Sequence, residues 1–185
     1  MFNVKKLAFG AALLAASAVC FAAPKVEIVT SEGNIVVNLN EKAAPTTVAN
    51  FVKYANEGFY NGTIFHRVIN NFMIQGGGFG RNLHQKSTHA PIKLEDKNGL
   101  KNTVGTIAMA RTNNPDSATS QFFINLKDND FLNGTSTKDG YAVFGEVVSG
   151  MDVVRKIGRA PTGSKGFMDD VPVRPVIIES VKVLK

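Results

Sequence analysis

The sequence has no tryptophan, a single cysteine and no block of like charges. Because Cys20 has no second cysteine to pair with, the chain cannot form an intramolecular disulfide, and packing must stabilise the fold. The formal net charge of +6 comes from lysines and arginines that are scattered along the chain. Nucleic-acid or anionic-membrane binding would need a basic stripe, so the sequence favours neither role.

Long hydrophobic runs are also missing, except at the start of the chain. A pair of lysines precedes an uncharged, mostly apolar stretch over residues 7–21, and Cys20 and Ala22 supply the small side chains that a cleavage site after Ala22 needs. The stretch is shorter than the roughly 20 apolar residues of a transmembrane helix. The pattern predicts a cleaved secretory signal peptide over residues 1–22, with an uncleaved anchor as the alternative.

The common motifs of cofactor and metal binding are absent from the sequence. The glycine-rich segment over residues 76–80 lacks the third glycine of a dinucleotide fingerprint, because Arg81 stands in its place. The acidic segment over residues 128–130 departs from a calcium-binding loop at Leu132. The three histidines do not have the spacing of a zinc site. We therefore expect no metal and no cofactor.

What the sequence does contain is a series of short strand patterns and two helical ones. Helical periodicity covers residues 45–58, and a shorter helix with a capping box is expected over residues 149–158. Period-two alternation, or a short apolar run, marks residues 26–40, 65–69, 72–78, 104–110, 121–126, 141–148 and 176–184. Many short strands with turns between them predict a closed barrel or a sandwich, here a mainly β domain over residues 23–185.

The stretch over residues 65–78 has the most informative side chains. Alternation places Phe65 and Arg67 on one face of the first strand, while Gln75 lies in the second strand. A buried arginine is costly unless it is paired or lines a cleft. The pattern alone leaves an edge strand with a solvated Arg67 equally open. Gln121 poses the same question, because a buried amide needs a partner, either in a site or in loop backbone.

Read in order, these segments resemble the cyclophilins, a family of peptidyl-prolyl cis–trans isomerases. The resemblance is greatest to the periplasmic cyclophilins of Gram-negative bacteria, the rotamase A group, and it covers nearly all of residues 23–185. It implies an eight-stranded closed antiparallel β-barrel capped by two α-helices. The motifs that carry the resemblance are residues 65–69, 72–77, 109–110, 120–124 and 143–145.

The resemblance also implies a set of site residues. Arg67 takes the place of the catalytic arginine, and Gln75 and Gln121 take the places of polar residues that hold the arginine and the substrate backbone. The implied substrate-binding residues are Phe72, Met73, Ala110, Arg111, Phe123, Phe131, Leu132 and Tyr141. Phe131 and Tyr141 stand where many eukaryotic members have Trp and His, and Arg111 replaces a common Asn. These departures imply weak cyclosporin binding and preserved catalysis.

The implied activity is rotation about X–Pro bonds in unfolded or partly folded exported proteins. The implied setting is the periplasm, and we expect a monomer without stable membrane association. Two alternatives stay open. One is a non-catalytic chaperone that holds exported chains in the same groove. The other is a small-ligand carrier, although bulky side chains favour a filled barrel interior.

Overall fold

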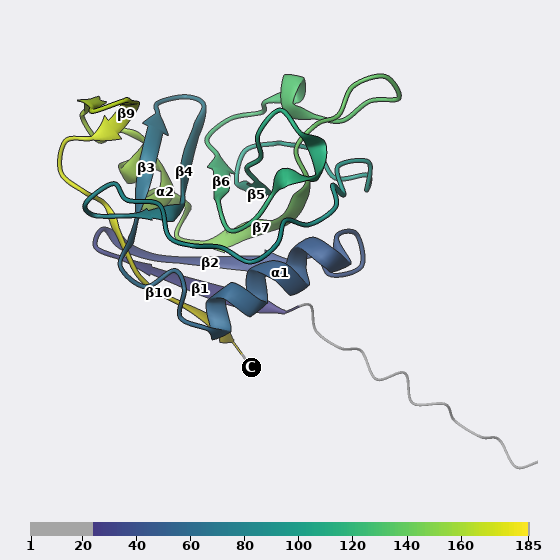
Figure 1. Ribbon diagram of the computed structural model, residues 1–185, viewed down its shortest axis with the longest axis horizontal. Coiled ribbons are helices and arrows are strands. Elements are labelled where there is room, and N and C mark those ends of the chain that lie inside the picture. Colours follow the sequence, from purple (N-terminus) through teal and green to yellow (C-terminus); the bar gives the residue numbers. More distant parts are fainter. Residues whose placement is uncertain (1–23, 185) are drawn as a thin grey trace, which may run out of the picture.

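Ten β-strands and two α-helices make up about half of residues 24–184, the part of the chain that the computed structural model describes (Figure 1). The strands that form the barrel are β1 (Lys25–Thr30), β2 (Gly33–Leu39), β3 (Thr63–Ile69), β4 (Met73–Gly80), β5 (Thr106–Met109), β6 (Phe122–Asn125), β7 (Val143–Ser149) and β10 (Ile177–Leu184). Their order around the closed barrel is β1–β10–β3–β4–β6–β5–β7–β2, and every neighbouring pair is antiparallel.

The other elements lie outside the barrel wall. They are α1 (Pro45–Asn56), α2 (Met151–Gly158), the 3-10 helices η1 (Pro115–Ser117) and η2 (Asp130–Leu132), and the hairpin strands β8 (Thr162–Lys165) and β9 (Met168–Pro172). The predicted closed antiparallel barrel with two α-helices is confirmed. The predicted signal peptide lies outside the described residues. No helix between residues 24 and 184 has the length and apolar character needed to cross a membrane.

The interior of the barrel is filled by apolar side chains from both helices and all eight barrel strands. Phe51 of α1 contributes the central ring, whose centroid lies 5.1 Å from that of Tyr60, 5.5 Å from Phe122 and 5.2 Å from Phe144. Val154 of α2 joins the same core. Each large apolar side chain buried here stabilises the fold by about 1.5–3 kcal/mol, so the barrel needs no disulfide.

The start of α1 is held by a residue far away in the sequence. Pro45 occupies the first turn, as predicted, and Ala44 offers no side-chain cap. The Glu95 carboxylate instead accepts hydrogen bonds from the backbone N–H groups of Thr46 and Thr47, at 3.1 and 2.9 Å. Desolvation raises the pKa of Glu95, but the hydrogen bonds from Thr47 and Thr46 together lower it by more than desolvation raises it. The net shift of the pKa is therefore downward. A carboxylate in this position also complements the helix dipole.

The capping box predicted before α2 is wrong. The residue that precedes the helix is Gly150, which has a φ of 84° and provides no side-chain cap. Its backbone passes so close to the carbonyl oxygen of Asn34 that any Cβ at this position would collide. The start of α2 is therefore fixed by a close approach to β2 and by glycine's freedom to adopt a positive φ.

Strand β3 carries a bulge that breaks the predicted alternation. Phe65 pairs with Gly76 and Arg67 pairs with Gln75, so His66 is an extra residue on β3. The prediction that Phe65 and Arg67 share a face is wrong, because Phe65 belongs to the barrel core whereas Arg67 lines an outer cavity. The bulge thus re-aims Arg67 away from the interior.

His66 is a structural residue, buried behind the bulge. Its side chain is almost inaccessible, its ring lies 4.6 Å from the Phe79 ring, and its Nδ1 atom has no hydrogen-bond partner among the described residues. Burial, together with the neighbouring Arg67 charge, lowers the pKa of His66 from 6.5 to about 4. The folded protein therefore keeps this imidazole neutral in mildly acidic solution.

The segment between α2 and the last strand also differs from expectation. The sequence shows no strand pattern there, but β8 and β9 form a two-stranded hairpin in which Thr162 pairs with Pro172 and Lys165 with Met168. Most side chains of β8 are exposed, so no hydrophobic alternation marks the strand in the sequence. In space, β9 packs against β3 (Figure 1).

Acidification should destabilise the fold through His66. Between pH 6.5 and pH 4 the unfolded chain binds a proton at His66 that the folded chain does not, so stability is full above pH 6.5 and declines toward pH 4. The free energy of unfolding should fall by about 3 kcal/mol across this window, as measured by urea denaturation. A His66→Phe variant should lose this part of the pH dependence, while His84→Gln, at an exposed position, should retain it. If the free energy of unfolding fell equally with pH in wild type and His66→Phe, the pH dependence could not be assigned to His66.

Candidate active site

A cavity of about 300 Å³ opens on the outer face of the barrel wall. On β6, Phe122 and Ile124 point into the barrel core, so Phe123 between them must point outward. The residues that line the cavity are Arg67, Phe72, Met73, Gln75, Ala110, Arg111, Phe123, Leu132 and Tyr141. These residues were all named from the sequence, and the fold brings them together from five separate segments of the chain.

The floor of the cavity is a second, smaller hydrophobic cluster that is separate from the barrel core. It is built on Met73, Phe123 and Leu132, with Phe72 packed against it at the edge. Phe131 does not line the cavity itself, but its ring stacks on Phe72 with centroids 5.6 Å apart and remains 58% exposed. The site thus offers a desolvated apolar recess with an open aromatic rim.

The polar side of the cavity is formed by neighbouring strands. Arg67 on β3 lies directly opposite Gln75 on β4. Gln75 Nε2 donates a hydrogen bond of 3.0 Å to Gln121 Oε1, which places Gln121 behind Gln75 rather than in the cavity wall. Among the described residues, neither glutamine is hydrogen-bonded to Arg67. The Arg67 guanidinium instead has Asp170 of β9 beside it, with Nε 3.9 Å from Oδ2.

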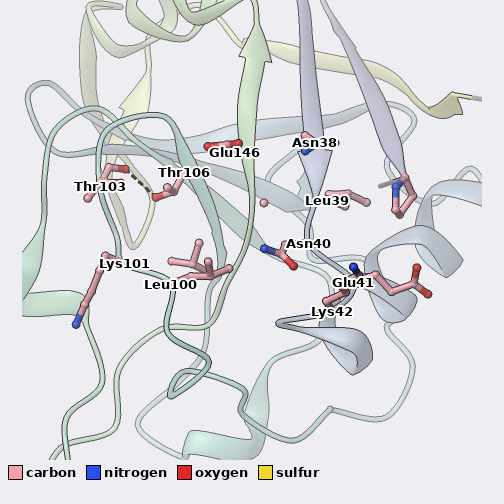
Figure 2. A pocket seen from close by; sticks show the side chains of 13 residues that line it. Asn38, Leu39, Asn40, Glu41, Lys42, Leu100, Lys101, Thr103, Thr106 and Glu146 are labelled. Atoms are coloured by element: carbon pink, nitrogen blue, oxygen red, sulfur yellow. Dashed lines mark hydrogen bonds between the residues drawn. The ribbon is translucent and has the colours of Figure 1, made fainter. Parts of the chain in front are cut away.

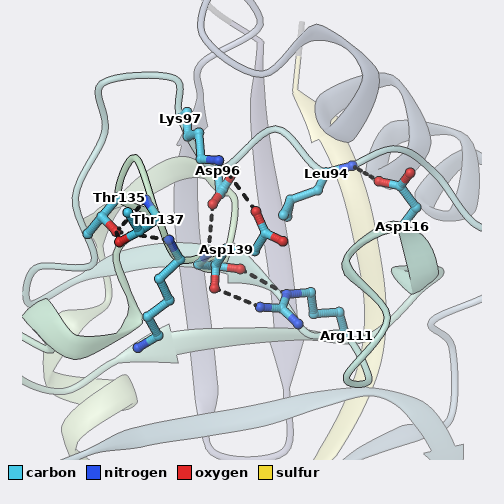
Figure 3. Close-up of polar contacts among 10 residues, drawn as sticks. Leu94, Asp96, Lys97, Arg111, Asp116, Thr135, Thr137 and Asp139 are labelled. Atoms are coloured by element: carbon cyan, nitrogen blue, oxygen red, sulfur yellow. Dashed lines mark hydrogen bonds and ion pairs between the residues drawn. The ribbon is translucent and has the colours of Figure 1, made fainter.

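Arg111 lines the cavity from the side of the loop that ends at Tyr141. Its Nε donates to the Gly140 carbonyl at 2.8 Å and its Nη2 to that of Asp139 at 3.0 Å (Figure 3). Its Nη1 donates to the Thr112 carbonyl at 2.8 Å. The guanidinium also lies over the Tyr141 ring, 4.7 Å from its centroid. With all its nitrogens engaged in this way, Arg111 clamps the loop that ends at Tyr141.

Beneath the cavity lies a network of buried asparagines that the sequence did not reveal. Asn102 Nδ2 donates to the carbonyl oxygens of Leu132 and Tyr141, both at 3.3 Å. Asn125 Nδ2 donates to Asn102 Oδ1 at 3.2 Å, and Asn129 Nδ2 donates to the carbonyl of Phe72 at 2.9 Å. The network therefore ties together the backbones of three cavity residues.

A larger cavity, of about 490 Å³, lies elsewhere on the surface, between β2, β7 and the segment over residues 100–106 (Figure 2). Its walls carry lysines, glutamates and asparagines, and none of the predicted site residues. Size alone does not single it out, because recognition depends on a few placed polar groups against an apolar wall. That combination occurs around Arg67.

The chemistry available around Arg67 is hydrogen-bond donation rather than proton transfer. The cavity lining contains neither a carboxylate nor an imidazole, and a guanidinium stays protonated in proteins. No group of three or more metal-ligating side chains occurs within residues 24–184. The recess suits a small apolar ring, and the adjacent guanidinium would stabilise a neighbouring atom that gains electron density.

Comparisons with known proteins agree with this arrangement. The family model described as "Cyclophilin type peptidyl-prolyl cis-trans isomerase/CLD" matches residues 25–183. A peptidyl-prolyl cis-trans isomerase of Acinetobacter baylyi is 56% identical over 180 residues, covering 97% of this chain and 96% of the relative. Isomerase B of Escherichia coli is 61% identical over 157 residues, covering 83% and 96%. A cyclophilin-type isomerase crystal structure from Cryptosporidium parvum gives a TM-score of 0.73 at 25% identity, covering 88% and 98%.

Removal of one network asparagine should destabilise the protein without touching the cavity directly. Asn102→Ala takes the Asn102 donor away from the Tyr141 carbonyl and leaves Asn125 Nδ2 with Thr106 Oγ1 as its acceptor, so the free energy of unfolding should fall by about 1–3 kcal/mol. Urea denaturation provides the measurement, and the exposed Asn113→Ala change should stay within about 0.5 kcal/mol of wild type. A similar small effect for Asn102→Ala would show that the network does not hold these loops.

Proposed function

The chain belongs to the family of cyclophilin-type peptidyl-prolyl cis–trans isomerases, and we propose that the cavity beside Arg67 is where it turns X–Pro bonds of exported proteins. One observation carries the assignment of the site: an arginine side chain lies beside an apolar recess lined by Phe72, Met73, Phe123 and Leu132. A proline ring fits such a recess because it is small, apolar and carries no N–H group.

The reaction needs no bond to break. Resonance in the X–Pro amide opposes rotation with a barrier of roughly 18–20 kcal/mol, which makes the uncatalysed exchange slow. At the top of the barrier the amide is twisted, its resonance is lost, and the proline nitrogen regains a lone pair. A protein that binds this twisted form better than either planar isomer accelerates both directions equally.

Arg67 is the residue that distinguishes the twisted amide from the planar ones. Its guanidinium donates to the proline nitrogen, which accepts a hydrogen bond only when the lone pair is localised. The apolar wall beside it lowers the local dielectric constant and strengthens this bond. Lysine is a poor substitute, because it lacks the planar, forked donor geometry of arginine.

The remaining site residues bind the proline ring and the rest of the substrate separately, so that one side of the X–Pro bond can rotate relative to the other. Phe72, Met73, Phe123 and Leu132 grip the ring, so the carbonyl side of the bond rotates while the ring stays fixed. Gln75, supported by Gln121, binds the substrate backbone. The residue before proline passes beside Ala110 and Arg111, whose clamp on the loop sets the width of the groove. These groups account for the remaining lining, with Tyr141 as the end wall.

The proposed setting is the periplasm, and it rests on the signal-peptide pattern over residues 1–22. The clients would be proline-containing segments of newly exported chains, bound by a monomeric enzyme. Cyclosporin should bind weakly, because Phe131 keeps an apolar rim but has no indole N–H to donate.

A second activity, chaperone-like holding of unfolded chains, is favoured by one observation. Phe131 is 58% exposed at the rim of the cavity, where an apolar segment of a client would find it. Suppression of aggregation that persists in an Arg67→Ala variant would support holding as a separate activity. The carrier alternative finds no support, since side chains fill the barrel.

Substitution of Arg67 should abolish most of the activity. The rate of cis–trans exchange in a blocked X–Pro peptide, measured by NMR exchange spectroscopy, should fall about 100-fold or more in Arg67→Ala, because the main donor to the twisted amide is gone. Arg67→Lys should show a similar loss. Arg81→Ala, at an exposed position beyond β4, should match wild type. Full activity in Arg67→Ala would place catalysis elsewhere.

A further inference from the structure

The β8–β9 hairpin brings a carboxylate to Arg67 from outside the barrel. Val171 anchors the hairpin by burying its side chain, and Lys165 Nζ donates to the carbonyl oxygens of Pro172 and Val173, each at 3.1 Å. The hairpin packs on β3, the strand that carries Arg67 (Figure 1). Asp170 is the hairpin residue whose side chain reaches the guanidinium.

The backbone at Asp170 is unusual for a strand. Its φ is 59°, in the left-handed region that residues other than glycine rarely adopt, and aspartate is among the few that tolerate it. A strained conformation of this kind persists only where the surrounding packing imposes it, and such residues cluster at functional sites. Here the conformation occurs at the hairpin residue whose carboxylate lies beside Arg67.

Arg67 has few other partners that could orient it. Its side chain is 43% exposed and flexible, so donation to a proline nitrogen requires that something hold the guanidinium. Gln75 uses its Nε2 for Gln121, and its Oε1 accepts no hydrogen bond from Arg67 among the described residues. Among the described residues, Asp170 provides the carboxylate that pairs with Arg67.

We propose that Asp170 is a positioning residue for Arg67, an inference that rests on the function proposed above. Its carboxylate lies on the Nε side of the guanidinium, with Oδ2 3.9 Å from Nε, and attracts that side of the guanidinium toward the hairpin. Both Nη groups are then left to donate to the proline nitrogen in the cavity. The hairpin, which lies outside the barrel, thereby becomes part of the catalytic apparatus.

The size of the effect follows from the exposure of the pair. Side chains that are about 40% exposed interact weakly and are screened by salt. Loss of the Asp170 charge should therefore reduce kcat/KM about twofold to fivefold, chiefly through kcat, because ground-state binding in the apolar recess is untouched. Added salt should remove most of the difference.

Asp170→Asn and Asp169→Asn form a matched pair for the test. Both remove one negative charge from the same hairpin, and asparagine also tolerates the left-handed conformation required at position 170. Asp169, however, accepts a hydrogen bond from Ser164 and makes no ion pair with Arg67. With an uncharged blocked peptide at low salt, Asp170→Asn should show the loss, and Asp169→Asn should match wild type. At about 1 M NaCl, wild type and Asp170→Asn should converge.

A second measurement does not depend on activity. The Arg67 Nε–H resonance, assigned by comparison with Arg67→Lys, should exchange with solvent faster in Asp170→Asn than in wild type or Asp169→Asn. An unchanged exchange rate, or equal activity losses in both hairpin variants, would overturn the positioning role. Failure of the wild-type protein to accelerate peptide exchange would instead refute the proposed function, while the resonance would still report whether Asp170 holds Arg67.

Discussion

The shape of the cavity depends on the cost of burying an amide without a partner. Three asparagine side chains are completely buried and form a chain of hydrogen bonds, in which Asn129 donates to Asn125 and Asn125 donates to Asn102. In a low-dielectric interior each lost hydrogen bond is expensive, so the loops whose carbonyls they hold have little freedom to shift. Phe72, Leu132 and Tyr141 keep their places because their backbones are tied to this network. A recess built on loops thereby gains the rigidity of the sheet.

The strands of the barrel wall contribute side chains to two hydrophobic clusters, one on each face. Its inner face carries the large core that includes Phe122 and Ile124, while the outer face of the same strand contributes Phe123 to the cavity floor. Because alternate residues belong to different clusters, the cavity can change without disturbing the barrel interior. The bulge at His66 adds to this separation, since it turns Arg67 outward while Phe65 and Val68 remain inside.

The barrel could be predicted from the sequence because period-two alternation and turn residues mark most of its strands. The cavity-lining residues could be named because they fall in segments that resemble one family. The remaining features depend on contacts between distant parts of the chain. Nothing local indicates that β3 is bulged, that Glu95 caps α1 or that Asn102 lies beneath Tyr141. Asp170 could not be identified for a further reason, since the hairpin that carries it has no hydrophobic periodicity and no strand pattern in the sequence.

Closure of the barrel has a consequence for the proposed function, in which the protein would meet unfolded chains. Every barrel strand among residues 24–184 has a hydrogen-bonded neighbour on each side, so the barrel has no edge strand to which another chain could add a strand along its whole length. The two-stranded sheet of β8 and β9 does have edges, but it is short and carries Lys165, Asp169 and Asp170. Under the proposed function, a client would meet mainly the side chains around a small recess. Such contact would let the client leave after each turnover and would give it little template for aggregation.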